Sequence, residues 1–183
     1  MIFAFDVAYN ENNIAQAAAI GFNSWTDDHP AVVYKEFVIG LESYTPGEFY
    51  KRELPCIEKL LLRIDRSQID LVIIDGFVFL DDDGKPGLGA YLYESLGGGI
   101  PVIGVAKTFF AHNTKNVVEV RRGESSKPLY ISSAGIAVKT AAERIETMHG
   151  HAPGLDWRAH FPDEMSARAD LTEAIGFIRS STS

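Results

Sequence analysis

The sequence predicts an α/β fold in which a mixed β-sheet is flanked by helices. Three apolar segments joined by short turns open the chain, which predicts an antiparallel meander of three strands. Apolar strand-like segments then alternate with helical patterns, which predicts parallel strands. The chain has 183 residues, of which 46% are hydrophobic and 23% are charged, as in a globular domain. We therefore expect residues 1–183 to form a single domain.

The predicted meander occupies the first forty residues. Apolar and β-branched residues predict strands over 2–9, 14–22 and 32–39. Asn10–Asn13 separates the first two strands, and Thr26–Pro30 separates the second from the third. Both segments are rich in residues that favour turns, so neighbouring strands should pair antiparallel.

A helix is predicted over residues 47–64. Its apolar stripe has helical spacing and consists of Phe49, Ile57, Leu60, Leu61 and Ile64. Glu53 lies four residues from both Phe49 and Ile57, so its carboxylate should lie on the inward face of the helix or at its rim. Pro55 cannot donate an interior helix hydrogen bond, which predicts a kink or a restart near Glu53.

The second half of the sheet is predicted to contain parallel strands. Apolar strands over 71–75 and 100–105 flank a helix over 87–96 that ends at Gly97–Gly99. Strand, helix, strand implies parallel pairing. The remaining expected elements are a hairpin of strands over 117–121 and 128–132 and helices over about 134–148 and 166–179. A three-stranded meander followed by this alternation is the order of a ribonuclease H-like fold.

Composition excludes several classes of protein. The net charge of −8 argues against tight, nonspecific binding to nucleic acid, which depends on many phosphate contacts. A single cysteine, Cys56, excludes an internal disulfide and a multi-cysteine zinc site. No apolar run is long enough for a membrane span, and Met1–Asp6 lacks the basic start of a signal peptide. We expect a cytoplasmic protein with no membrane contact and no obligate protein partner.

Three acidic residues indicate phosphodiester chemistry. Asp6 and Asp75 each follow an apolar run, and Glu53 lies on the apolar stripe of a helix. A carboxylate in such a position needs solvent, a charged partner or a cation. Hard cations such as Mg²⁺ take a few carboxylate oxygens and keep positions open for water and phosphate. A second run of acids, Asp81–Asp83, is interpreted as a solvated turn.

The chain resembles the endonuclease V family, whose members nick nucleic acid one nucleotide beyond a deaminated purine. The resemblance spans most of the chain. The order and spacing of its motifs are more specific than any one motif. The matching segments are Asp6-Val7-Ala8-Tyr9, Tyr44-Thr45-Pro46-Gly47, Arg52-Glu53-Leu54-Pro55, Asp75-Gly76, Leu88-Gly89 and Pro101-Val102-Ile103-Gly104-Val105-Ala106-Lys107.

The resemblance implies a site for Mg²⁺ or Mn²⁺. Asp6, Glu53 and Asp75 match the acids that hold the divalent metal in the family. A fourth metal residue is expected near the last helix. Asp170 fits the family pattern there and is favoured by the length of chain that follows it. His160 is the alternative, because some members use histidine.

The resemblance also implies residues that contact the substrate, which is DNA or RNA with deaminated or distorted bases. Lys107 matches the family lysine near the scissile phosphate. Tyr44 and Pro46 match part of the wedge that separates strands beside the lesion, although this chain has Ser43 where the family has its first proline. Gly76 and the residue after it, Phe77, belong to the loop that shapes the base pocket.

That loop departs from the family pattern. After Gly76 the family has a glycine and a histidine-proline loop, whereas this chain has the longer segment Phe77–Pro86. We expect Phe77, Val78 and Phe79 to narrow the base pocket or to form a stacking wall. The expected activity is metal-dependent cleavage near inosine. The alternatives are a ribonuclease H-like binding module with lost or altered cleavage, and a structure-selective nuclease.

Overall fold

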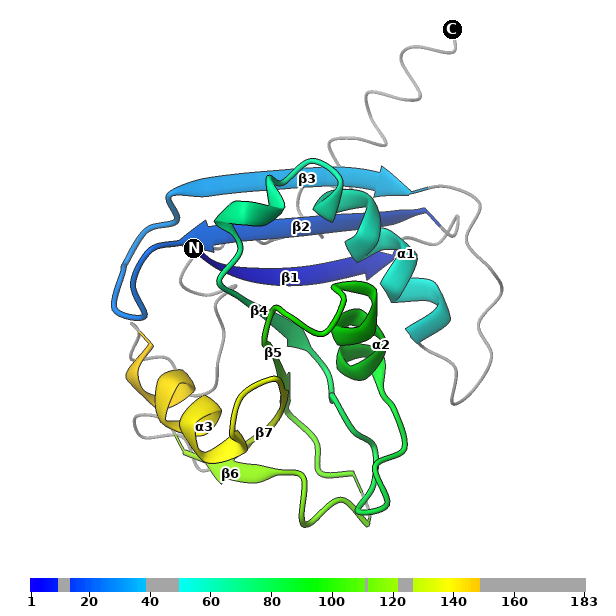
Figure 1. The fold of residues 1–183 in the computed structure, drawn as a ribbon, viewed down its shortest axis with the longest axis vertical. Coiled ribbons are helices and arrows are strands. Elements are labelled where there is room, and N and C mark those ends of the chain that lie inside the picture. Colours follow the sequence, from blue (N-terminus) through cyan, green and yellow to red (C-terminus); the bar gives the residue numbers. More distant parts are fainter. Residues whose placement is uncertain (10–13, 39–49, 111, 122–126, 149–183) are drawn as a thin grey trace, which may run out of the picture.

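The structure, a computed structural model, describes residues 1–9, 14–38, 50–110, 112–121 and 127–148. In this part of the chain one mixed sheet has the strand order β3-β2-β1-β4-β5-β7-β6 (Figure 1). The strands are β1 (Ile2–Tyr9), β2 (Ala15–Phe22), β3 (Val32–Val38), β4 (Leu71–Asp75), β5 (Val102–Ala106), β6 (Val118–Val120) and β7 (Leu129–Ala134). The helices are α1 (Tyr50–Leu61), α2 (Leu88–Ser95) and α3 (Val138–Thr147), with a short 3₁₀ turn at Arg66–Gln68.

Strand pairing confirms the predicted ribonuclease H-like fold. β1 and β2 pair antiparallel, as do β2 and β3, which gives the expected meander. β1 pairs parallel with β4, and β4 pairs parallel with β5. The predicted hairpin forms β6 and β7, and β7 extends the sheet by pairing antiparallel with β5.

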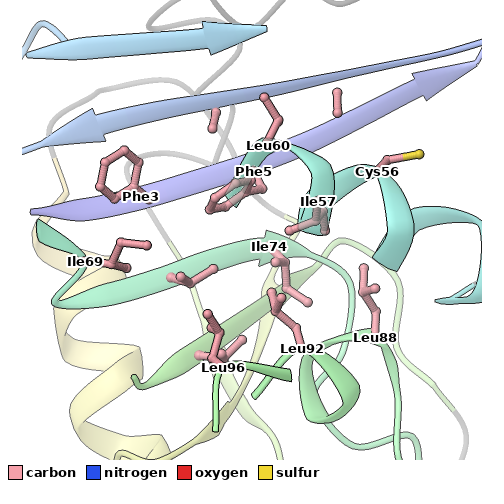
Figure 2. Close-up of a cluster of buried hydrophobic side chains, with 14 of the residues drawn as sticks. Phe3, Phe5, Cys56, Ile57, Leu60, Ile69, Ile74, Leu88, Leu92 and Leu96 are labelled. Carbon is pink, nitrogen blue, oxygen red and sulfur yellow. The ribbon is translucent and has the colours of Figure 1, made fainter. Parts of the chain in front are cut away.

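Helices cover both faces of the sheet. α1 and α2 pack on one face, where Phe3 and Phe5 of β1 belong to one buried cluster with Ile57 and Leu60 of α1 (Figure 2). α3 packs on the other face through Ile145 and its neighbours. Since successive side chains of a strand point to opposite faces, the apolar strands β1, β2, β4 and β5 supply residues to both cores. No helix in the described residues is long and apolar enough to cross a membrane.

The helix restart expected near Glu53 is absent. α1 continues from Tyr50 to Leu61 through Pro55, which forgoes one backbone hydrogen bond. Ile57 and Leu60, on the turn after the proline, are almost completely buried against the sheet. Their burial stabilises the continuous helix and offsets the missing hydrogen bond.

The boundaries of the last helices differ from the prediction. Ala134 is the final residue of β7 and not the start of a helix, because the chain turns at Gly135 with a φ of 74°. α3 therefore begins at Val138. The helix expected over residues 166–179 lies outside the described residues.

A first prediction concerns Gly104 in the middle of β5. A Cβ at this position would lie 2.5 Å from the Gly76 carbonyl oxygen and 2.9 Å from the Val78 nitrogen. Neither backbone atom can move without distorting the loop that follows β4. We expect Gly104→Ala to lower the free energy of unfolding by roughly 1–3 kcal/mol, as overpacking does in other cores.

Urea denaturation of the purified protein measures this change. The control is Gly99→Ala, because a Cβ at Gly99 meets no atom within 4 Å. Equal stability of the two variants would show that the loop yields to the added methyl group.

Candidate functional site

Asp6 and Asp75 lie side by side on neighbouring strands. The parallel pairing of β1 with β4 ends at Phe5 opposite Ile74, and each acid is the next residue along its strand. Asp6 is not at the strand end or at a solvated rim, since β1 continues to Tyr9 and only 6% of Asp6 is exposed. A carboxylate this deeply buried requires compensation by a partner or a cation.

Glu53 approaches the same place from a helix. It lies on α1 with 7% of its surface exposed, so the inward orientation is confirmed. All three acids line one pocket of about 500 Å³, beside the middle of β1 and the carboxyl end of β4. The other lining residues are Phe5, Val7, Tyr50, Ile57, Ile74, Gly76, Phe77, Leu80, Gly87, Leu88 and Phe110. The pocket thus combines three carboxylates with a largely apolar wall.

The donor set fits a hard divalent cation in its chemistry. Carboxylate oxygens are the ligands that Mg²⁺ and Mn²⁺ prefer. In the described part of the chain, no three histidine, cysteine, aspartate or glutamate side chains lie close enough to hold one ion. The acids therefore share a pocket without forming a closed ligand cluster. Asp170 and its alternative His160 lie outside the described residues.

Glu53 lies among partly buried titratable side chains whose pKa values its charge affects. Burial and, secondarily, the charge of Glu53 raise the pKa of the Cys56 thiol to about 11. Burial followed by the Glu53 charge also raises the pKa of the Tyr9 phenol well above its ordinary value. The Arg52 guanidinium lies 4.4 Å from the centre of the Tyr9 ring. Charge acts strongly in such a setting, because little water screens it.

Backbone N–H groups of the loop after β4 donate hydrogen bonds to strands β5 and β7. Gly76 has a φ of 129°, and its N–H donates to the Val105 carbonyl at 2.9 Å. The Val78 N–H donates to Ser132 Oγ at 2.9 Å. Val78 is completely buried beneath the loop, and Phe79 packs against the α1/α2 core. The expectation that all three bulky residues narrow the pocket is therefore wrong for two of them.

Aromatic residues line part of the same pocket. Phe77 lines the pocket as expected, and its ring packs edge-on against Phe110 with centroids 6.1 Å apart. Sequence reasoning missed Phe110, although an aromatic pair in an otherwise polar segment was a visible signal. It also missed Tyr50, whose ring stacks on Tyr91 at 4.0 Å. Phe110 becomes a neighbour of Phe77 only through the tertiary fold, whereas Tyr50 lies about one helical turn before Glu53 on α1.

The remaining candidates lie beyond the pocket wall or outside the described chain. Lys107 directly follows β5, is exposed, and is not among the residues that line the pocket. It is two residues beyond Val105, the residue paired with Asp75. Tyr44 and Pro46 lie outside the described residues.

The ribonuclease H-like fold hosts nucleases whose carboxylates meet near the centre of the sheet, and comparison with known families agrees with that class. The family model for endonuclease V matches residues 1–156. The chain belongs to the endonuclease V family. No curated protein sequence matches it significantly.

Solved structures of endonuclease V share the fold. The chain is 14% identical to the Ciona intestinalis enzyme in complex with a 24mer DNA that contains an inosine followed by a ribo-adenosine, with a TM-score of 0.74 over 94% of this chain and 86% of that chain. The human enzyme is 17% identical, with a TM-score of 0.72 over 93% and 85%. The Bacillus subtilis enzyme is 17% identical, with a TM-score of 0.72 over 94% and 82%.

Proposed function

We propose that this protein is a divalent-metal-dependent endonuclease that cleaves DNA or RNA near a deaminated base, with inosine as the expected lesion. The observation that carries the proposal is the convergence of Asp6, Glu53 and Asp75 on one pocket in a chain of the endonuclease V family. The Ciona intestinalis relative is bound to inosine-containing DNA, which supports this class of substrate.

The acids have a defined role in the proposal. Asp6, Glu53 and Asp75 would hold Mg²⁺ or Mn²⁺, and Asp170 would complete the set. When bound, the divalent metal supplies Lewis-acid stabilisation of charge on the phosphate. The burial of Asp6 and Glu53 keeps water away from their carboxylates, which strengthens their attraction for a cation.

Other residues contact the nucleic acid. Lys107 adds positive charge beside the scissile phosphate, where negative charge develops during cleavage. Tyr44 and Pro46 contribute to strand separation. Gly76 and Phe77 form the side of the pocket that receives the base.

The pocket predicts weak discrimination between hypoxanthine and adenine. The N–H groups of Gly76 and Val78 donate to protein oxygens, so they are not directed at a base. Phe77 and Phe110 offer ring surfaces that accept any base. A pocket rejects the wrong base when that base would leave buried polar groups of the pocket without hydrogen-bond partners. An apolar wall has few such groups, so it discriminates weakly. We expect a preference for inosine, with detectable cleavage of matched adenosine strands.

Incubation with labelled oligonucleotides tests the proposal. Inosine and adenosine versions of one single strand and one duplex are compared in Mg²⁺, in Mn²⁺ and in EDTA. Cleavage in EDTA equal to that in Mg²⁺ would contradict the metal-dependent mechanism. Cleavage confined to inosine substrates would show that the loop reads the base through groups other than the Gly76 and Val78 amides. Cleavage without any inosine preference would favour a structure-selective nuclease.

A further inference from the structure

Four consecutive exposed residues, Lys107–Phe110, follow β5 and carry two aromatic rings. Phe109 is 47% exposed and Phe110 is 49% exposed. Among the described residues, the other large hydrophobic side chains with comparable exposure are Val33 and Leu62, which are isolated aliphatic residues. Two adjacent exposed phenyl rings form an apolar patch of the kind that marks a binding surface.

The patch continues into the candidate pocket. Phe109 packs against Tyr130 of β7, with ring centroids 5.4 Å apart. Phe110 packs against Phe77 and lines the pocket. Two aromatic pairs, joined by the peptide bond between Phe109 and Phe110, therefore connect strand β7 to the pocket.

A carboxylate fixes the chain beyond the patch. Asp82 accepts hydrogen bonds from the Thr114 N–H at 2.5 Å, the Thr114 hydroxyl at 2.7 Å and the Lys115 N–H at 2.6 Å. The Asp82 N–H donates to the His112 carbonyl at 2.9 Å. The Lys115 amide and the Thr114 hydroxyl hold the pKa of Asp82 below its ordinary value. These bonds weaken only as pH falls through that lowered pKa, so they are intact at neutral pH.

Two asparagines tie the same segments together. Asn113 Nδ2 donates to the Phe79 carbonyl at 2.6 Å, and Asn116 Nδ2 donates to the Asp81 carbonyl at 2.8 Å. With the Asp82 bonds, they join residues 112–116 to the loop that follows β4. The aromatic patch is thus held between β5 and a hydrogen-bonded segment, which reduces the entropy lost when it binds a ligand.

We propose that Phe109, Phe110 and Tyr130 form a stacking surface for an unpaired nucleotide of the substrate strand, beside the base pocket. This proposal rests on the proposed function, because the strand that enters the pocket is the strand that reaches the patch. A ring can stack on a base only when the face of that base is free of its neighbours. Lys107 lies at the end of the patch, and its ammonium complements the phosphate of such a nucleotide.

Charge supports a nucleotide held by stacking. The net charge of −8 argues against affinity built from many phosphate contacts, which favours base stacking as a source of binding free energy. In the described residues, Lys107 makes no hydrogen bond or ion pair to another side chain, whereas Arg121 pairs with Glu119. The Lys107 ammonium and the two half-exposed phenyl rings lie in the same four-residue segment.

Fluorescence anisotropy tests the stacking surface. The probes are a labelled single-stranded DNA without inosine and the duplex of the same sequence, both in EDTA. We expect Phe109→Ala to weaken binding of the single strand by at least about fivefold, the lower range for loss of one base–aromatic stack, and to change duplex binding much less. Leu62→Ala is the matched control, because Leu62 is 88% exposed and distant in sequence from the patch.

A second pair of variants tests the anchoring of the patch. Asp82→Ala removes the carboxylate that holds Thr114 and Lys115, whereas Asp83 is exposed and its carboxylate makes no such bonds. We expect Asp82→Ala, and not Asp83→Ala, to speed hydrogen exchange over residues 112–116 and to weaken single-strand binding. Faster hydrogen exchange with unchanged single-strand binding would show that the Asp82 hydrogen bonds do not contribute to the stacking surface.

Several outcomes overturn the stacking surface itself. Binding by Phe109→Ala equal to wild type, or an equal loss for strand and duplex, would contradict it. If Phe109→Ala binds nucleic acid as the wild type does, but sediments as a monomer where the wild type sediments as a dimer, the patch is a protein interface. Since the probe lacks inosine and EDTA removes divalent metal, the result is independent of cleavage. Binding through Phe109 without cleavage of any substrate would contradict the proposed function alone.

Discussion

Asp6→Asn is expected to abolish cleavage and leave the fold intact. Asparagine has nearly the shape of aspartate, so β1 keeps its pairing, but the charge at the centre of the acidic pocket is lost. Loss of a group that merely orients a metal ligand typically lowers metal affinity or activity by roughly 10- to 100-fold. Loss of a charged ligand should exceed that range. The measurement is single-turnover cleavage of an inosine strand in Mg²⁺, with circular dichroism as the test of folding.

Two comparisons make this prediction specific. Asp75→Asn should have the same effect, because Asp75 lies beside Asp6 on the neighbouring strand. Asp83→Asn serves as the control, since it removes a similar charge from an exposed turn. Divalent metal should raise the Tm of the wild-type protein and not that of Asp6→Asn/Asp75→Asn. An equal rise in both proteins would place metal binding elsewhere.

Lys107→Ala is expected to lower kcat by roughly 100-fold, the loss typical when one group that stabilises transition-state charge is removed. KM should change less, because the phosphate gains most of its interaction with the lysine as charge develops. Lys107→Arg should restore little activity, since a planar guanidinium places its charge differently. Steady-state cleavage of the inosine strand at several concentrations separates kcat from KM.

The control for this variant is Lys85→Ala. Lys85 is exposed on the loop after β4, and only its backbone N–H donates a hydrogen bond there, to Asp81. Its removal changes the net charge by the same amount as Lys107→Ala. A similar loss in both variants would indicate a general electrostatic effect. Unchanged turnover in Lys107→Ala would remove Lys107 from the site.

The order of elements was predictable because local patterns carry it. Turn residues between 2–9, 14–22 and 32–39 predicted the meander, and the apolar segments around helix α2 predicted parallel pairing. The uninterrupted helix at Pro55 was not predictable from local preferences. There, burial of Ile57 and Leu60 against the sheet outweighs the missing hydrogen bond. The start of α3 was also misplaced, because Ala134 gains a strand partner in β5.

The sequence by itself determined the order of the elements along the chain, the family resemblance and the three acids, because each depends on the types and spacing of residues near one another in the chain. Only the tertiary structure decided what surrounds those acids. It buried Val78 beneath the loop and brought Phe110 against Phe77, which lies thirty-three residues earlier in the chain. It also joined Asp82 to Thr114. These contacts depend on how β4, β5 and β7 align in the sheet, and sheet alignment arises from the packing of both cores and not from any local sequence pattern.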